Sequence, residues 1–218
     1  TDADWRADAS QAAVFRFGYF DCFAPERLAQ FQRWEAQGTR PLNPATFYLD
    51  SKAVLAAARL PRVLERVAAR DPAGPDVLAR CLPETVLLRP AEVARLADER
   101  ERWVLKFAGF DNGQQAWGGR SLQIGLAHTP ASWEAVLREY LALPFPVVAQ
   151  RLAPSAAVDI PYLDEQGQIQ TLPAGVTRLR SFFLRGQAPA GSHLTVSGGT
   201  MQVSEATEAV QAPVVFQT

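Results

Sequence analysis

The sequence contains little cysteine, histidine or lysine and no long apolar run. Cys22 and Cys81 lack Cys-x-x-Cys spacing, which argues against a disulfide framework or zinc site and favours a reducing, cytoplasmic environment. His128 and His193 show no metal-ligand spacing either. No stretch approaches the roughly 20 apolar residues of a membrane-spanning helix, and the acidic residues 1–4 do not resemble a signal peptide. With a net charge of -1 and no run of like charges, we expect neither nucleic acid nor a membrane as partner.

Lysine is much scarcer than arginine. Of the 22 basic residues, only Lys52 and Lys106 are lysines. GC-rich coding explains such a bias without any function. An arginine-rich chain that keeps two lysines also directs attention to sites where a compact ammonium differs from a planar guanidinium. Phosphate coordination beside a metal ion is one such site, so the surroundings of each lysine matter.

Apolar periodicity predicts a mixture of helices and strands. In the first 44 residues we predict a β-α-β piece with a strand at 12–18, a helix from Pro25 to Gly38 and an extended segment at 40–44. Further on we predict helical residues 47–70 broken at Pro61, followed by a turn or loop at 71–76. Predicted strands lie at 84–89, 102–107, 120–125 and 146–152, and predicted helices at 91–98 and from Thr129 or Ser132 to Leu143. A mobile glycine-rich loop is predicted at 108–119. Segments suited to an antiparallel sheet follow at 168–172, 177–184, 192–196 and 200–203.

The segment WVLKF places Lys106 near the end of a strand, directly before the glycine-rich loop. Glycines let backbone N–H groups approach phosphates and a lysine supplies charge, so this arrangement fits a triphosphate site. By itself, a lysine at this position is more often a solvated strand end. The loop is not a Walker A loop, because no GxxxxGK[ST] opens a helix, and no GxGxxG follows the first strand.

The order of these segments resembles the ATP-grasp superfamily. Lys52, preceded by Asp50-Ser51, resembles the family's first phosphate lysine. Residues 104–107 resemble its V-x-K-P strand, with Phe107 in place of the proline. Residues 147–152 resemble its hinge strand, whose backbone pairs with the adenine edge.

Two later segments extend the resemblance. Residues 177–183 resemble the R-x-F strand near the γ-phosphate, and residues 196–203 resemble a following GG-x-x-x-V turn. This tail is most similar to the glutathionylspermidine-synthase-like and circularly permuted branches. The resemblance spans roughly residues 46–204 and rests on the order of the motifs, since no single motif is specific.

The resemblance implies an α+β fold in which two small α+β subdomains sandwich ATP, preceded by a short α/β segment. The domains expected from it are a β-α-β preamble at 1–45, an N-terminal ATP-grasp subdomain at 46–146 and a C-terminal subdomain at 147–218.

The implied activity is that of an ATP-dependent carboxylate–amine ligase with ATP and Mg²⁺ as cofactors. ATP would phosphorylate an unidentified carboxylate to an acyl phosphate, which an unidentified amine then attacks. Arg178 and Arg180 would meet the charge that develops at the transferred phosphoryl group. The residues implied to bind the cofactor are Lys52, Lys106, Gly118, Gly119, Arg120, Gln150, Arg151 and Leu152.

The tail departs from the family in its magnesium ligands. It offers arginines and Gln202 but no E-x-N motif, and its acids, mostly expected in turns or on the surface, are Asp159, Asp164, Glu165, Glu205 and Glu208. The metal ligands therefore stay unassigned. Either a further segment or a partner chain completes the site, or the chain is a degenerate module that binds nucleotide or a protein without catalysis, or the strand alignment is wrong. Besides the ligase and the degenerate module, a structural α+β interaction domain without nucleotide is a third interpretation of the function.

Overall fold

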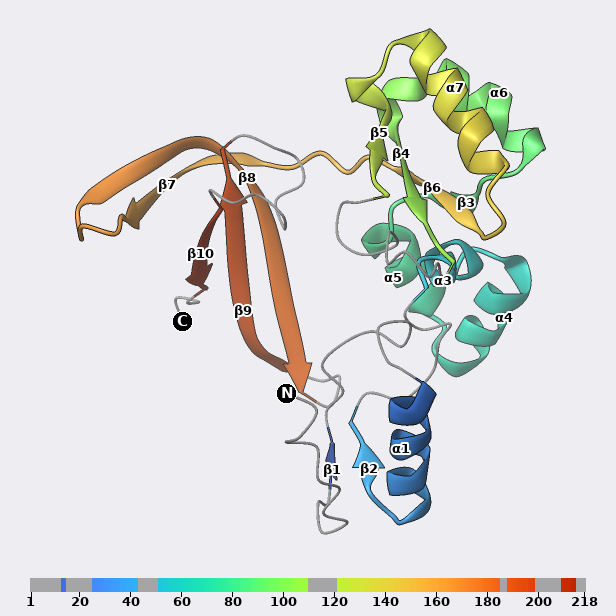
Figure 1. Ribbon diagram of the computed structural model, residues 1–218, viewed down its shortest axis with the longest axis horizontal. Coiled ribbons are helices and arrows are strands. Elements are labelled where there is room, and N and C mark those ends of the chain that lie inside the picture. Colours follow the sequence, from blue (N-terminus) through green and yellow to red (C-terminus); the bar gives the residue numbers. More distant parts are fainter. Residues whose placement is uncertain are drawn as a thin grey trace. The chain divides into compact units, whose positions relative to one another are not determined.

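The fold is mixed α+β, as the sequence predicts. The computed structural model describes residues 13–14, 25–42, 51–109, 121–184, 188–198 and 209–214. The chain divides into two compact units, residues 1–117 with 121–152 and residues 118–120 with 153–218 (Figure 1). Each unit contains a four-stranded antiparallel sheet.

The chain begins with a small strand–helix–strand piece. Strand β1 (Ala13–Val14) pairs in parallel with β2 (Arg40–Pro41), and α1 (Pro25–Ala36) connects them. Proline at the first helical position has no N–H that would need a partner there. Gly38, with φ of 93°, adopts the left-handed conformation that follows many helix ends.

Between residues 51 and 82 the chain forms the short helices α3 (Ala53–Ala57), α4 (Pro61–Arg70) and α5 (Gly74–Cys81). The predicted break at Pro61 is present, because this proline starts α4. The prediction of a loop over 71–76 is wrong beyond residue 73. Pro75 lies in the first turn of α5, where a missing N–H breaks no helical hydrogen bond, so the proline starts a helix here and does not prevent one.

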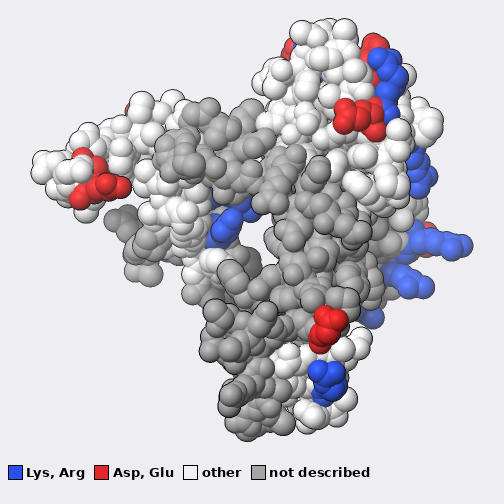
Figure 2. Space-filling view, in the orientation of Figure 1, with Lys and Arg blue, Asp and Glu red and all other residues white. Residues whose placement is uncertain are grey.

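Helix α4 has one strongly basic side. Its exposed arginines Arg62, Arg66 and Arg70 recur at helical spacing, and Figure 2 shows basic side chains on the surface around α4 and α5. Val63, Leu64 and Val67 on the other side are half-buried. The arginines thus form the solvated side of an amphipathic helix.

The first unit is built on a sheet with strand order β3-β6-β4-β5, all pairs antiparallel. Its strands are β3 (Thr85–Leu87), β4 (Trp103–Phe107), β5 (Gln123–Ile124) and β6 (Val147–Arg151), and its helices are α6 (Val93–Asp98) and α7 (Pro130–Leu141). Short 3-10 turns cover Pro90–Glu92, Arg100–Arg102 and Gly125–Ala127. The strands before and after the glycine-rich segment, β4 and β5, pair with each other. Thr129 caps α7 by accepting a hydrogen bond from the Ser132 amide (3.2 Å).

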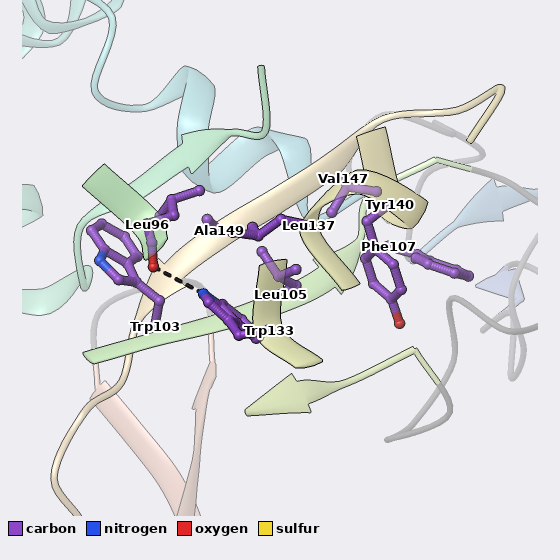
Figure 3. Packing of buried hydrophobic residues seen from close by; sticks show 9 residues of the cluster. All are labelled: Leu96, Trp103, Leu105, Phe107, Trp133, Leu137, Tyr140, Val147 and Ala149. Atoms are coloured by element: carbon purple, nitrogen blue, oxygen red, sulfur yellow. Dashed lines mark hydrogen bonds between the residues drawn. The ribbon is translucent and has the colours of Figure 1, made fainter. Parts of the chain in front are cut away.

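Helices α6 and α7 pack on one face of this sheet (Figure 3). The core there contains the fully buried Leu105, Leu137 and Trp133, and the Trp133 indole donates a hydrogen bond to the Leu96 carbonyl (2.9 Å). Side chains alternate along a strand. Because Leu105 faces the helices, Lys106 belongs to the opposite face of the sheet.

The second unit is an antiparallel sheet with strand order β10-β9-β8-β7. Its strands are β7 (Ala157–Leu163), β8 (Ile169–Leu184), β9 (Ala188–Ser197) and β10 (Val210–Pro213). The described residues of this unit include no helix, whereas an α+β subdomain was expected. The division into two ATP-grasp subdomains stays a prediction. The sequence places the subdomain boundary before Val147, and the structure includes β6 in the first sheet.

Strand β8 corrects the prediction of two separate strands at 168–172 and 177–184. The chain continues through Pro173 and Ala174 because the pairing with β7 shifts register between Val158 and Ile160. Ala174 has φ of 48°, and its amide donates to Asp159 Oδ1 (2.7 Å). The sequence did not predict β7 or β10. The expected strand at 200–203 lies outside the described residues.

In the described ranges, no helix is both long enough and apolar enough to cross a membrane.

Candidate functional site

Lys106 is held by a chain of polar side chains across three strands. Its Nζ donates to Gln150 Oε1 (2.7 Å), and Gln150 Nε2 donates to Thr85 Oγ1 (3.0 Å). The Thr85 hydroxyl donates in turn to the Pro83 carbonyl (3.0 Å). Gln150 is 8% and Thr85 2% exposed. Gln150 therefore links Lys106 on β4 to Thr85 on β3.

The segment that carries Lys52 is joined to the end of β4. Ser51 Oγ donates a hydrogen bond to the Ala108 carbonyl and accepts one from the Ala53 amide (3.1 Å). Ser51 thereby satisfies the amide of the first residue of α3; Asp50 lies outside the described residues. Helix α3 also contacts β3 and β6. Lys52 and Lys106 therefore lie in segments that meet where β4 ends.

Burial changes the titration of Lys52. Desolvation lowers the pKa of its ammonium below the ordinary value of 10.5, because the charged form loses contact with water. An anion bound beside it would restore part of that lost stabilisation.

The chain is fixed in place where it leaves β4. The amides of Ala108 and Gly109 both donate to the Pro146 carbonyl (2.8 and 3.0 Å). A Cβ atom on Gly109 would lie 2.6 Å from Phe145 Cβ, so a larger residue does not fit without a shift. The loop residues that the resemblance implies to bind the cofactor lie outside the described part of the chain: Gly118, Gly119 and Arg120.

Arg151 belongs to an ion-pair cluster at the other end of β4. Its guanidinium contacts Glu84 (3.3 Å) and Glu99 (2.8 Å) and lies 4.6 Å from the centre of a Trp103 ring. The guanidinium of Arg95 lies 4.9 Å from the centre of a Trp103 ring and also contacts Glu84 (2.7 Å). Burial would raise the pKa of the Glu84 carboxyl, but the hydrogen bonds and charges of Arg95 and Arg151 lower it overall.

The remaining hinge residues differ in their environment. The Leu152 amide donates to the Arg102 carbonyl (2.8 Å), which extends the pairing of β6 with β4 by one residue. Gln150 contacts Lys106 directly. Of the three hinge residues predicted to bind the cofactor, Gln150 is therefore the one whose side chain joins the lysine. Thr85 was missed, because only strand pairing brings it opposite Gln150.

In the second unit, Arg178 and Arg180 are exposed on β8. Their spacing of two residues puts them on the same face of the sheet. Thr195 and His193 on β9 are their directly paired neighbours. His193 is thus added to this basic face by the pairing register, which the sequence did not reveal.

Two acidic residues of the second unit accept hydrogen bonds from backbone amides, and Glu165 is exposed in the turn between β7 and β8. Asp159 accepts from the Ala174 amide, and Asp164 accepts from the amides of Gln166 and Gln168 (3.0 and 2.8 Å). Hydrogen bonds from Gln170 and then Gln168 lower the pKa of Asp164. Within the described ranges, no three His, Cys, Asp or Glu residues gather into a metal site. The candidates Glu205 and Glu208 lie outside those ranges, so the magnesium ligands stay unassigned.

A surface depression in the first unit is lined by residues 97–102 and Pro130. Arg100 at its wall donates to the carbonyls of Gly125 (2.6 Å) and His128 and contacts Glu101 (2.9 Å). These bonds hold the 3-10 turn after β5. The depression contains none of the predicted site residues.

No protein-family model matches this chain, and no curated protein matches it either. The ATP-grasp relationship therefore rests on the order of the elements and on the surroundings of the two lysines, and it is a proposal.

Proposed function

We propose that the first unit binds the phosphates of ATP-Mg²⁺ through Lys52 and Lys106. The observation that carries this proposal is the hydrogen bond from Ser51 to Ala108, which joins the segment of one lysine to the strand end of the other. Two lysines in segments that meet at the end of β4 would supply the charge that a di- or triphosphate needs.

We further propose that the chain is the ATP-binding part of an ATP-grasp-like carboxylate–amine ligase. A carboxylate oxygen would attack the γ-phosphorus of ATP, ADP would leave, and an amine would displace phosphate from the acyl phosphate. The two lysines would hold phosphates during transfer, and Arg178 and Arg180 would meet the developing charge. The position of β6 directly beside β4 supports this proposal, because a nucleotide held by Lys106 would lie near the proposed hinge strand.

A second candidate is a module that binds nucleotide without catalysis. The described residues include no cluster of three acidic or other metal-ligating side chains, and arginine cannot replace carboxylates as a magnesium ligand. A ligase would need a partner chain or a further segment to supply them. Turnover measured with and without Mg²⁺ separates the two candidates.

The binding proposal is tested by calorimetry and by melting temperature with ATP-Mg²⁺. A ligand that binds only the folded state at 100 times its Kd stabilises the protein by about 2.7 kcal/mol. Lys106→Ala should lose most of this ATP-dependent increase. Arg138→Ala is the matched control, because Arg138 is an exposed cation on α7, on the helix-covered side of the sheet. Equal ATP affinity in Lys106→Ala and wild type would refute the site.

A further inference from the structure

We infer that Thr85 is a positioning residue for Lys106 and acts on it through the amide of Gln150. The ligand in this inference rests on the proposed function, whereas the positioning of the ammonium does not. Thr85 is almost completely buried, so it does not contact a ligand that enters from solvent. Any effect of Thr85 on phosphate binding must pass through its neighbours.

The hydrogen-bond directions fix the orientation of the Gln150 amide. Thr85 Oγ1 has one hydrogen, and it is donated to the Pro83 carbonyl. The same oxygen can then only accept from Gln150, so the NH₂ group of the amide faces Thr85. The amide oxygen consequently faces Lys106, where it accepts from Nζ.

Strand pairing makes this arrangement specific. Thr85 lies directly opposite Gln150 in the β3–β6 pair. Lys106 lies opposite Val148 in the β4–β6 pair, which is two residues from Gln150 and on the same face. Because Gln150 and Thr85 are buried, water cannot readily replace a lost partner.

Removing the hydroxyl of Thr85 should therefore misorient the amide. Valine has nearly the shape of threonine but accepts no hydrogen bond. In Thr85→Val the Gln150 NH₂ group loses its acceptor, and the amide is free to turn. The turned amide presents N–H donors to an ammonium that is also a donor, which displaces Lys106 Nζ.

The experiment compares Thr85→Val with the conservative variant Thr85→Ser. Calorimetry should show ATP-Mg²⁺ affinity reduced about tenfold in Thr85→Val and within about twofold of wild type in Thr85→Ser. A ligand-free readout is the NMR spectrum of the lysine ammonium groups, which is simple because Lys52 and Lys106 are the only lysines. We expect the Lys106 signal to move in Thr85→Val and to return in Thr85→Ser. The Lys52 signal, the internal control, should stay in place.

The outcomes separate this inference from the proposed function. If wild type does not bind ATP-Mg²⁺, the proposed function fails, and the Lys106 signal alone decides the inference. If wild type binds, an unchanged affinity or an unchanged Lys106 signal in Thr85→Val overturns the inference and leaves the proposed function standing.

If Thr85→Val does not fold, Gln150→Glu replaces it. A carboxylate can accept from Lys106, but it has no N–H group to donate to Thr85. ATP-Mg²⁺ affinity should fall about tenfold or more, and wild-type affinity in Gln150→Glu would overturn the inference.

Discussion

The two lysines occupy different environments, although their segments meet at one sheet end. Lys106 donates to a buried amide whose orientation is fixed by Thr85. Lys52 is desolvated, and its pKa is lowered by burial.

Lys52→Met should separate stability from binding. Because the folded pKa of Lys52 lies below 10.5, the unfolded state binds more protons between the lowered pKa and 10.5, and stability rises with pH in that window. At neutral pH the charged side chain therefore costs stability. We expect an unchanged or slightly higher melting temperature without ligand, a flatter pH dependence in that window, and a smaller ATP-dependent increase. A clearly lower melting temperature of the ligand-free variant at pH 7 would contradict this reasoning.

Gly109→Ala tests the close packing where β4 ends. The added Cβ would lie 2.6 Å from Phe145 Cβ and 2.9 Å from Pro146 Cδ. We expect a loss of about 1–3 kcal/mol in the free energy of unfolding, measured in urea. Gly191→Ala is the control, because its Cβ would meet no atom within 4 Å. Equal stability of the two variants would show that Phe145 and Pro146 adjust freely.

At the scale of elements, the side chains of β4 alternate between the helix-covered core on one face of the sheet and the opposite face. Its Trp103, Leu105 and Phe107 are buried in the helix-covered core, and Lys106 belongs to the other face. The Trp103 end is surrounded by the cluster of Arg95 and Arg151 with their acidic partners. This cluster connects α6 with β6 and with the residue before β3. We therefore expect it to stabilise the sheet without affecting the Lys106 end of β4.

The contribution of this cluster to stability should depend on pH, and the variant Glu84→Gln tests this dependence. Because the folded pKa of Glu84 is lowered, its ionised form stabilises the protein above the unfolded pKa of about 4.3, and the contribution is lost as pH falls through the folded pKa. We expect the variant to lose about 1 kcal/mol at pH 7, since the ion pairs are partly solvated. In urea unfolding, the difference should shrink as the pH falls through the folded pKa and vanish below it. Glu134→Gln, which removes a more exposed pair with Arg138, should lose less at pH 7, and a loss as large as that of Glu84→Gln would argue against the cluster.

At the scale of the whole molecule, the two units differ in their cores. Among the described residues, Val196 is the only fully buried apolar side chain of the second unit, whereas the first unit contains Trp103, Trp133 and Leu105 with many others. Apolar burial is the main stabilising contribution to folding. The described part of the second unit is therefore expected to be the less stable one.

Hydrogen exchange followed by mass spectrometry measures this difference directly. Peptides that cover β4 and β6 should exchange at least about tenfold more slowly than peptides that cover β7, because opening of the first sheet exposes far more apolar surface. A segment of β8 around Gly175, which packs against Val196, is expected to be intermediate. Equal protection of β4 and β7 would show that both units unfold together.

Local sequence rules predicted the elements of the first unit well and those of the second poorly. Between 84 and 152 each strand or helix has its own apolar periodicity and a clear boundary, such as Thr129 before α7. In the second unit, a register shift carries β8 through Pro173, although local propensity argues for an interruption. Such a shift depends on the neighbouring strand, so a single segment does not encode it.

The sequence by itself determined the α+β class and the order along the chain of the helices and strands between residues 84 and 152. It also determined the alternation of side chains along β4, which separates Lys106 from the core. These properties follow from periodicity and backbone preferences within one segment. Only the tertiary structure decided that Ser51 bonds to Ala108, that Thr85 lies opposite Gln150, and that Arg151 joins an ion-pair cluster. The physical reason is that each of these contacts joins segments far apart in the chain, and its geometry is set by strand register and packing, which depend on both segments together.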